Sequence, residues 1–183
     1  GLFVRLARAQ RGRYAAYVDT GRHVICSASP ELFFHLAAGL LTSRPMKGTA
    51  SRGRTLAEDE AQAAWLRASE KNRAENVMIV DMIRNDMGRL AQWGSVAAPN
   101  LFDVERYPTL WQMTSTVTAR TRASRVQILQ ALFPCASITG APKVRTMEII
   151  AGLEPAPRGV YTGAIGWMAS GGRAQFNVAI RTV

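Results

Sequence analysis

The chain has 183 residues, of which 48% are hydrophobic and 20% are charged, a composition typical of a globular protein and not of a disordered one. Its 23 basic and 13 acidic residues give a net charge of +10, which allows either a nucleic-acid surface or attraction of a small anionic substrate. The arginines are scattered along the chain without a basic block, so we expect no nucleic-acid partner.

Cysteine spacing indicates a reducing compartment, and hydropathy predicts no membrane span. Cys26 and Cys135 lie far apart without a CxxC or histidine-rich spacing, so neither a disulfide nor a zinc site is expected. No apolar run reaches the length needed to span a membrane, and no charged-then-apolar leader opens the chain. We therefore expect a cytoplasmic protein with one domain and no membrane partner.

The first third of the chain predicts β-structure. Residues 2–28 alternate apolar and polar side chains, with turn signals at 11–12 and 20–21, which favours two or three antiparallel strands. Residues 32–34 and 40–42 resume the strand pattern.

The middle of the chain is helical and then strand-like again. The helical pattern runs over 56–87, with a break expected at 72–73 and an end at Gly88. Residues 95–117 predict strands, and a short helix capped by its first residue is expected over 124–133.

A loop followed by a helix at 133–150 is the most informative local pattern. Ser137 and Thr139 are capping residue types, and Pro142 suits the first helical turn. Small residues before a helix leave backbone N–H groups free at the positive end of its dipole, which suits an anion. The alternative is an ordinary capped surface helix. The apolar stripe expected to be buried is Val144, Met147 and Ile150.

A final hairpin is predicted by residues 160–169 and 173–183, which bracket the turn at 170–172. Tyr161 and Arg181 fall on its two predicted strands and would either bind a carboxylate together or form a cross-strand surface pair. Strands at both ends with helices between them predict an α+β fold of mixed, largely antiparallel sheets with helices packed outside.

Glu75 places a carboxylate on an otherwise apolar helix face, which is costly unless a cation or hydrogen-bond donor meets it. Mg²⁺ is one such cation, because it prefers carboxylate oxygens with some water retained. The alternative is that Arg84–Asp81 and Arg89–Asp86 form surface pairs and Glu75 points to solvent. The residues that share its face are Met78, Ile79, Met82 and Asp86.

Lys47 is a candidate nucleophile in a chain that has only three lysines. Unlike arginine, lysine can lose its proton and attack a substrate. It lies between Pro45 and Gly48-Thr49, and the glycine allows a ligand to approach the backbone. Glu31, on the preceding turn, is a candidate proton donor or acceptor for it. The alternative is a solvated turn lysine.

Taken together, these segments resemble the chorismate-utilising enzymes, and within that family they are most similar to the aminodeoxychorismate synthase group. The resemblance covers nearly the whole chain in the family's order. The matching segments are Ser29-Pro30-Glu31, Arg44-Pro45-Met46-Lys47-Gly48-Thr49, Ala74-Glu75-Asn76-Val77-Met78-Ile79-Val80-Asp81, Arg84-Asn85-Asp86-Met87-Gly88-Arg89, Ser137-Ile138-Thr139-Gly140-Ala141-Pro142-Lys143-Val144-Arg145, Tyr161-Thr162-Gly163-Ala164-Ile165-Gly166 and Ala179-Ile180-Arg181-Thr182.

The resemblance implies an anthranilate/aminodeoxychorismate synthase-like sandwich and amination of chorismate to 4-amino-4-deoxychorismate, in para-aminobenzoate and folate synthesis. It implies that Lys47 adds to C2 of chorismate while the 4-hydroxyl leaves, with Glu31 as general acid. Ammonia, delivered by a glutamine amidotransferase partner, then attacks C4 and expels the lysine.

The resemblance also implies further site residues. Glu75 matches a glutamate that holds Mg²⁺ against the ring carboxylate of the substrate. The implied substrate-binding residues are Gly48, Ser137, Thr139, Gly140, Ala141, Tyr161 and Arg181.

Three departures from the family pattern bear on these expectations. Anthranilate synthases usually have alanine at the position of Lys47 and histidine at that of Gln112. Both differences argue against anthranilate synthase component I, which is therefore the second interpretation. A basic nucleic-acid-binding domain, favoured only by the net charge, is the alternative from another class.

Ala136 stands where the family usually has glycine. The family's preceding portion and its following segment, with a second metal-binding glutamate, are not in this sequence. We therefore expect residues 1–183 to be a partial chorismate-binding catalytic domain, inactive or nearly so by itself.

Overall fold

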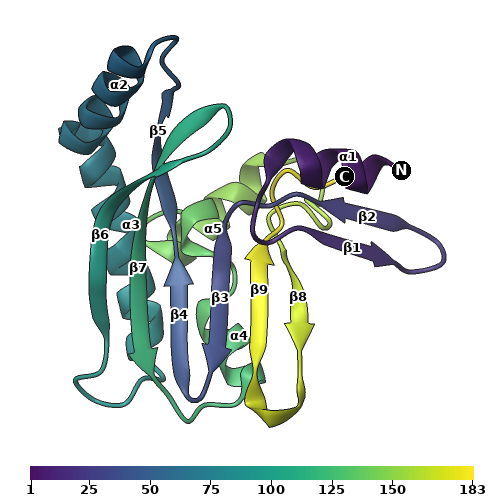
Figure 1. Ribbon diagram of the computed structural model, residues 1–183. Helices are drawn as coiled ribbons and strands as arrows, with labels where there is room; N and C mark the ends of the chain where they lie inside the picture. The colour runs from purple at the N-terminus through teal and green to yellow at the C-terminus, as the bar shows by residue number, and fades with distance from the viewer.

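The computed structural model describes residues 1–183 as a seven-stranded sheet, a separate two-stranded sheet and five α-helices (Figure 1). Every strand pair is antiparallel, so the predicted α+β class is confirmed. The strands are β1 (Ala16–Asp19), β2 (Val24–Ser27), β3 (Leu32–Ala37), β4 (Leu40–Arg44), β5 (Met46–Ser51), β6 (Ala97–Arg106), β7 (Leu110–Arg120), β8 (Ala164–Met168) and β9 (Ala174–Val178). The helices are α1 (Leu2–Gln10), α2 (Leu56–Ala68), α3 (Glu70–Gly88), α4 (Arg125–Leu132) and α5 (Lys143–Leu153), with 3₁₀ turns η1 (Ala136–Ile138) and η2 (Ser170–Gly172).

Strand β7 organises the large sheet, because three strands pair with it. The strand order is β5-β7-β4-β3-β9-β8, and β6 pairs with β7 along its other edge. Strands β4 and β5 pair with successive halves of one edge of β7, with Pro45 between them. The Pro45 carbonyl accepts a hydrogen bond from the Ser115 amide at 3.2 Å, so the chain stays attached to β7 where β4 gives way to β5.

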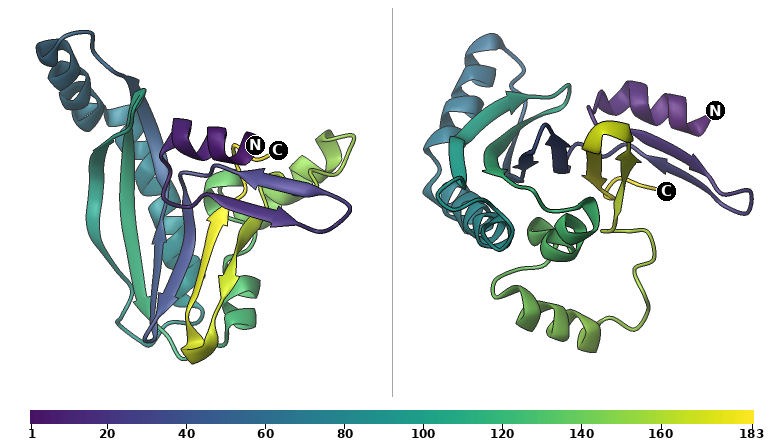
Figure 2. Two further views of the ribbon diagram at one scale, coloured as in Figure 1. Left: turned by 45° about the vertical axis from the view of Figure 1, so that its right-hand side comes forward. Right: turned by 90° about the horizontal axis from the view of Figure 1, so that it is seen from below.

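Helices α3 and α4 cover one face of this sheet, and α5 stands outside α4 (Figure 2). Burial of apolar side chains between α3 and the central strands provides the main stabilisation. The buried residues of this core are Phe33, Phe34, Leu36, Leu41, Ile79, Val80, Ile83, Met87, Val117, Ala119, Ile128, Leu132, Cys135, Ala136, Ala174 and Val178.

Helices α2, α3 and α4 begin at residues that supply capping side chains. The Thr55 hydroxyl accepts from the Glu58 amide at the start of α2, and Ser69 does the same for α3. Ser124 caps α4, as predicted, and with Gln127 it forms a reciprocal capping box.

A partly buried ion pair fastens α2 to the sheet. The Arg52 guanidinium binds the Asp59 carboxylate through two N–H groups, at 2.6 and 2.5 Å, and stacks on the Trp111 ring. Asp59 also accepts from the Trp111 indole at 2.9 Å. The hydrogen bonds from Arg52 are the largest of several contacts that hold the pKa of Asp59 well below its usual range.

The prediction of strands throughout residues 2–28 is wrong for its first part. Residues 16–27 form the β1–β2 hairpin, but Leu2–Gln10 is helical. The half-buried positions of α1 are Phe3, Leu6, Ala7 and Gln10. These recur every three to four residues, which a helix matches and a strand does not.

The break in the long helical segment lies at Ser69, three residues before the predicted one. Asn72 donates to the Ser69 hydroxyl from its backbone and from its side chain, at 3.4 and 2.9 Å. Asn72 therefore belongs to the first turn of α3 and does not end a helix. No helix of the protein is both long enough and apolar enough to cross a membrane.

Candidate active site

Glu31 is a buried carboxyl at the start of β3. Its residue is 4% exposed, and its backbone amide donates to the Ser29 hydroxyl at 3.3 Å. The Oε1 atom is buried without a hydrogen-bond partner, which is rare for a charged group. Burial raises the pKa of Glu31 from 4.5 to about 7. A carboxyl in this condition can carry a proton near neutral pH.

Lys47 lies close to Glu31, on strand β5. Against the effect of burial, three neighbours act to lower the pKa of Glu31: the Ser137 hydroxyl, the charge of Lys47 and the Met46 amide. The structure therefore brings together the two predicted catalytic residues with one of the predicted substrate-binding residues. Glu31 comes directly before β3, Lys47 is on β5 and Ser137 is in the η1 turn.

The backbone beside Lys47 requires glycine. Gly48 has φ +93°, a conformation that side-chain-bearing residues rarely adopt. A Cβ added at Gly48 would lie 3.0 Å from Cβ of Asn72 on α3. Helix α3 therefore lies close to the backbone at Gly48, and the approach of a ligand to this glycine stays a prediction.

The small-residue loop before α5 packs next to this cluster. Thr139 donates from its hydroxyl to the carbonyls of Cys135 and Ala136, both at 3.3 Å. Gly140 has φ +155°, and a Cβ there would lie 3.1 Å from Cγ2 of Thr146. Ala141 is exposed and precedes the helix.

The predicted caps and buried stripe of α5 are both wrong. Helix α5 starts after Pro142 without a side-chain cap, while Ser137 and Thr139 stabilise the preceding turn and loop. Val144 is 71% exposed and Met147 is 40% exposed. The physical reason is that α5 stands away from the sheet, so its apolar side chains have no core to enter (Figure 2).

Lys143 attaches this helix to the rest of the protein, a role that local sequence patterns did not reveal. Its ammonium donates to the Asp86 carboxylate at 2.6 Å and to the Leu132 carbonyl at 2.9 Å. Asp86 also pairs with Arg89 at 2.9 Å. The scarcity of lysines and its place in a family-matching segment marked Lys143, but neither predicted its bond to Asp86.

The Glu75 side chain is half-exposed, and both ion pairs of the alternative interpretation form. Only Arg84–Asp81 is a surface pair, because the Asp86 carboxylate that Arg89 contacts is buried. The Arg84 guanidinium lies 2.9 Å from the Asp81 carboxylate, and the Arg89 guanidinium lies 2.9 Å from that of Asp86. The Glu75 side chain is 45% exposed. Lys71 lies 3.8 Å from the Glu75 carboxylate.

The position of Glu75 is compatible with a single ligand to a hydrated metal ion. Its neighbours on α3, Asn72 and Asn76, contact β5 at Gly48 and Lys47, so Glu75 lies on the helix segment beside the cluster. The structure holds no group of three or more metal-ligating side chains. Mg²⁺ often binds through one or two protein carboxylates plus substrate and water, so an accessible Glu75 fits that mode as one ligand.

Tyr161 and Arg181 do not lie on the strands of the final hairpin, so that prediction is wrong. The β8–β9 hairpin itself forms, but Tyr161 lies in the turn before β8 and Arg181 lies beyond β9. Arg181 donates to the side chain of Gln10 at 3.2 Å. The backbone beyond β9 leaves the hairpin to pair with β2, through the bridge between Ser27 and Thr182.

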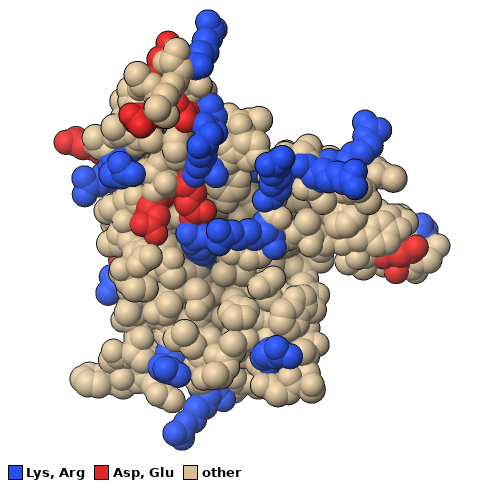
Figure 3. Space-filling model, in the orientation of Figure 1, with Lys and Arg blue, Asp and Glu red and all other residues tan.

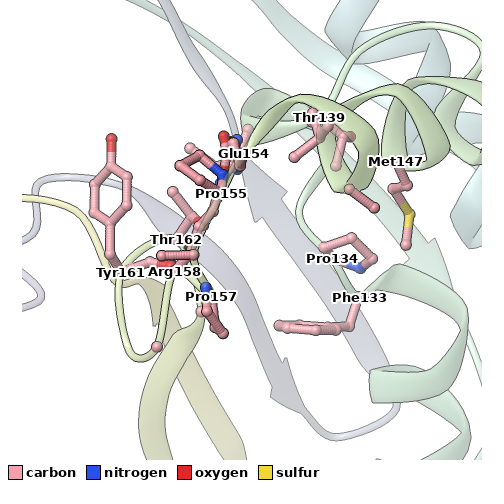
Figure 4. A pocket seen from close by; sticks show the side chains of 16 residues that line it. Phe133, Pro134, Thr139, Met147, Glu154, Pro155, Pro157, Arg158, Tyr161 and Thr162 are labelled. Atoms are coloured by element: carbon pink, nitrogen blue, oxygen red, sulfur yellow. Dashed lines mark hydrogen bonds and ion pairs between the residues drawn. The ribbon is translucent and has the colours of Figure 1, made fainter.

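An open cavity of about 550 Å³ lies between α5, the loop before it and the turn before β8 (Figure 4). Among the predicted site residues only Thr139 and Tyr161 line it. Glu31 and Lys47 are not in its wall, so the cavity is beside the candidate chemistry and does not contain it. Figure 4 shows Tyr161 and Met147 on opposite sides of the hollow.

Cys135 is excluded as a nucleophile of this site. Burial raises the pKa of Cys135 to about 12, so its thiol is not a nucleophile at neutral pH.

Lys and Arg side chains form separate groups on the face seen in Figure 3, with acidic residues among the upper group.

The chain matches the family described as chorismate binding enzyme over residues 1–183. The chain belongs to this family. It is 49% identical over 181 residues to an aminodeoxychorismate synthase of Streptomyces griseus, covering 97% of this chain and 25% of that protein. It is 45% identical over 184 residues to aminodeoxychorismate synthase component 1 of Bacillus subtilis, covering 100% of this chain and 39% of that protein.

Among solved structures, anthranilate synthase component I of Streptococcus pneumoniae superposes with a TM-score of 0.89 at 34% identity. The superposition covers 98% of this chain and 40% of that chain. The predicted family and fold are therefore confirmed. The chain spans between a quarter and two fifths of the length of these relatives.

Proposed function

We propose that this chain carries the catalytic lysine of an aminodeoxychorismate synthase, which aminates chorismate to 4-amino-4-deoxychorismate. The observation that carries the proposal is Lys47 beside a buried Glu31 whose Oε1 atom has no partner. Relatives that bear this name at 45–49% identity support the assignment.

In the proposed reaction, Lys47 and Glu31 divide the first step between them. The Lys47 amine forms a bond to C2 of chorismate and loses a proton, both ring double bonds shift by one position, and the C4–O bond breaks. Glu31 donates its proton to the departing hydroxyl, which leaves as water. A carboxyl with a pKa of about 7 suits this task, because an effective general acid has a pKa near the working pH. Ammonia then bonds to C4, and the bond between Lys47 and C2 breaks to regenerate the amine.

The remaining predicted residues bind and orient the substrate in this proposal. Tyr161 and Arg181 would contact its carboxylates, and Glu75 would hold Mg²⁺, which as a Lewis acid neutralises the ring carboxylate. Ser137 would keep the Glu31 carboxyl oriented. The backbone and loop contacts would come from Gly48, Ser137, Thr139, Gly140 and Ala141.

The ammonia source is also a proposal. A relative named component 1 implies a second component for that protein, and a glutamine amidotransferase is the partner we infer for the product of this gene. Para-aminobenzoate synthesis, and so folate synthesis, would be the pathway served.

One observation favours a second candidate. The structural likeness to an anthranilate synthase component I, with a TM-score of 0.89, is compatible with anthranilate formation. The full-length product of the gene that encodes this chain, incubated with chorismate, ammonium and Mg²⁺, separates the two by the mass of the product. We expect aminodeoxychorismate, and anthranilate would overturn the proposed subgroup while keeping the family.

A further inference from the structure

Lys47 lies on a bulge in strand β5. The register pairs Met46 with Thr114 and Thr49 with Gln112. Two residues of β5, Lys47 and Gly48, therefore face a single residue of β7. A bulge of this kind bends its strand and changes the direction of the side chains it carries. The direction of the Lys47 amine thus depends on what holds the bulge in shape.

Gln112 binds one end of the bulge with both halves of its amide. Its Nε2 donates to the Gly48 carbonyl at 2.8 Å, and its Oε1 accepts from the Thr49 hydroxyl at 3.1 Å. The Gln112 residue is 7% exposed, so water competes little for either hydrogen bond. An amide group is planar, so one orientation must satisfy both contacts.

Asn76 binds the other end of the bulge from helix α3. Its Nδ2 lies 3.5 Å from the Lys47 carbonyl, and its Oδ1 accepts from the Ser115 hydroxyl at 2.5 Å. Asn76 is fully buried. The carbonyls of Lys47 and Gly48 are thus held by amides from two different elements, and the Gln112 contact is the shorter one.

We propose that Gln112 is a positioning residue whose amide fixes the Lys47–Gly48 bulge and so aims the Lys47 amine. This inference deepens the proposed function and rests on Lys47 as the reacting group. The Gln112 side chain makes its hydrogen bonds to Gly48 and Thr49, and none to Glu31 or to the small-residue loop, so its effect on the reaction passes through Lys47.

Two substitutions separate the halves of the amide. Gln112→Leu removes donor and acceptor at similar volume, and Gln112→Glu keeps the acceptor for Thr49 but removes the donor to Gly48. Gln130→Leu, at an exposed position of α4, is the matched control. Each variant is made in the full-length gene product and compared in steady-state chorismate amination and in thermal unfolding.

A second readout measures the position of the amine without any turnover. The rate at which trinitrobenzenesulfonate labels Lys47 is followed by peptide mass spectrometry in each variant. We expect Gln112→Leu to lower kcat by about 10- to 100-fold with little change in KM, because a displacement of about 1 Å costs that order of rate. We expect the Lys47 labelling rate to change by at least about 3-fold in both Gln112 variants, while Gln130→Leu behaves as wild type, since rotating the amine alters its access and surroundings.

Wild-type labelling of Lys47 in Gln112→Leu, with kcat within about 2-fold of wild type, would overturn the inference, because the bulge would then keep its shape without the amide. If Gln112→Leu unfolds, the near-isosteric Gln112→Glu supplies the same test. Lys47→Ala is assayed alongside. Full activity in Lys47→Ala would remove the proposed covalent role, whereas the labelling data would still decide whether Gln112 positions this lysine.

Discussion

Replacing Glu31 with glutamine is expected to make the protein more stable at alkaline pH and inactive as an enzyme. Burial raises the pKa of this carboxyl from 4.5 to about 7, so the folded state binds its proton more tightly than the unfolded state does. The contribution of Glu31 to stability is therefore complete below about pH 4.5 and is lost as the pH rises to about 7. Above that, the folded protein holds a buried carboxylate whose Oε1 has no partner.

The magnitude follows from the pKa change. With each pKa unit equal to about 1.4 kcal/mol, ionised Glu31 destabilises the folded state by about 3 kcal/mol at pH 8. Glutamine is neutral at every pH, so Glu31→Gln should recover most of this energy at pH 8 and little at pH 4.5. The same change should lower kcat by about 100-fold or more, because glutamine cannot donate a proton to the departing hydroxyl.

The assay is guanidinium unfolding of the full-length gene product at pH 4.5 to 8, without chorismate. Glu60→Gln, at an exposed position of α2, is the control and should match wild type throughout. Equal stability of wild type and Glu31→Gln at pH 8 would refute the reasoning, as would a wild-type advantage that grows with pH.

Three further predictions follow from the same region. Gly48→Ala should cost about 2 kcal/mol of stability or more, measured by chemical unfolding, because it combines a positive φ with a Cβ only 3.0 Å from an α3 side chain; wild-type stability would contradict this. Lys143→Met should lower the free energy of unfolding by about 3 kcal/mol, because the buried Asp86 carboxylate loses the ammonium that lies 2.6 Å from it. An unchanged unfolding midpoint would show that other contacts hold α5. Ser137→Ala should move the upper pH limit of activity to higher pH, because the Ser137 hydroxyl lowers the pKa of Glu31 and its removal raises that pKa. An unchanged pH profile would show that Ser137 does not act on Glu31.

Local patterns predicted the elements whose signals were unambiguous. The β8–β9 hairpin and the helices between residues 56 and 88 formed as expected, because turn residues, caps and periodicity all favoured one answer. The strand prediction for residues 2–10 was wrong because so short an apolar pattern fits either period. The helix that forms there packs against the β1–β2 hairpin. There the ring centroids of Phe3 and Tyr17 lie 5.6 Å apart.

Contacts between distant segments explain the other differences. Arg181 leaves the predicted strand because the chain beyond β9 pairs with β2, which no local pattern encodes. The bond between Lys143 and Asp86 joins residues 57 positions apart. By contrast, Glu31, Lys47 and Ser137 were each named from sequence, and the fold brings them together.

The central claim is that Lys47 attacks chorismate. The most direct measurement compares the full-length gene product with Lys47→Ala and with the control Lys71→Ala, each given chorismate, ammonium and Mg²⁺. We expect aminodeoxychorismate from wild type and from Lys71→Ala, and a rate lower by about 100-fold or more in Lys47→Ala, as expected when a covalent nucleophile is removed. Aminodeoxychorismate formed by Lys47→Ala at the wild-type rate would contradict the claim and reduce Lys47 to a binding residue.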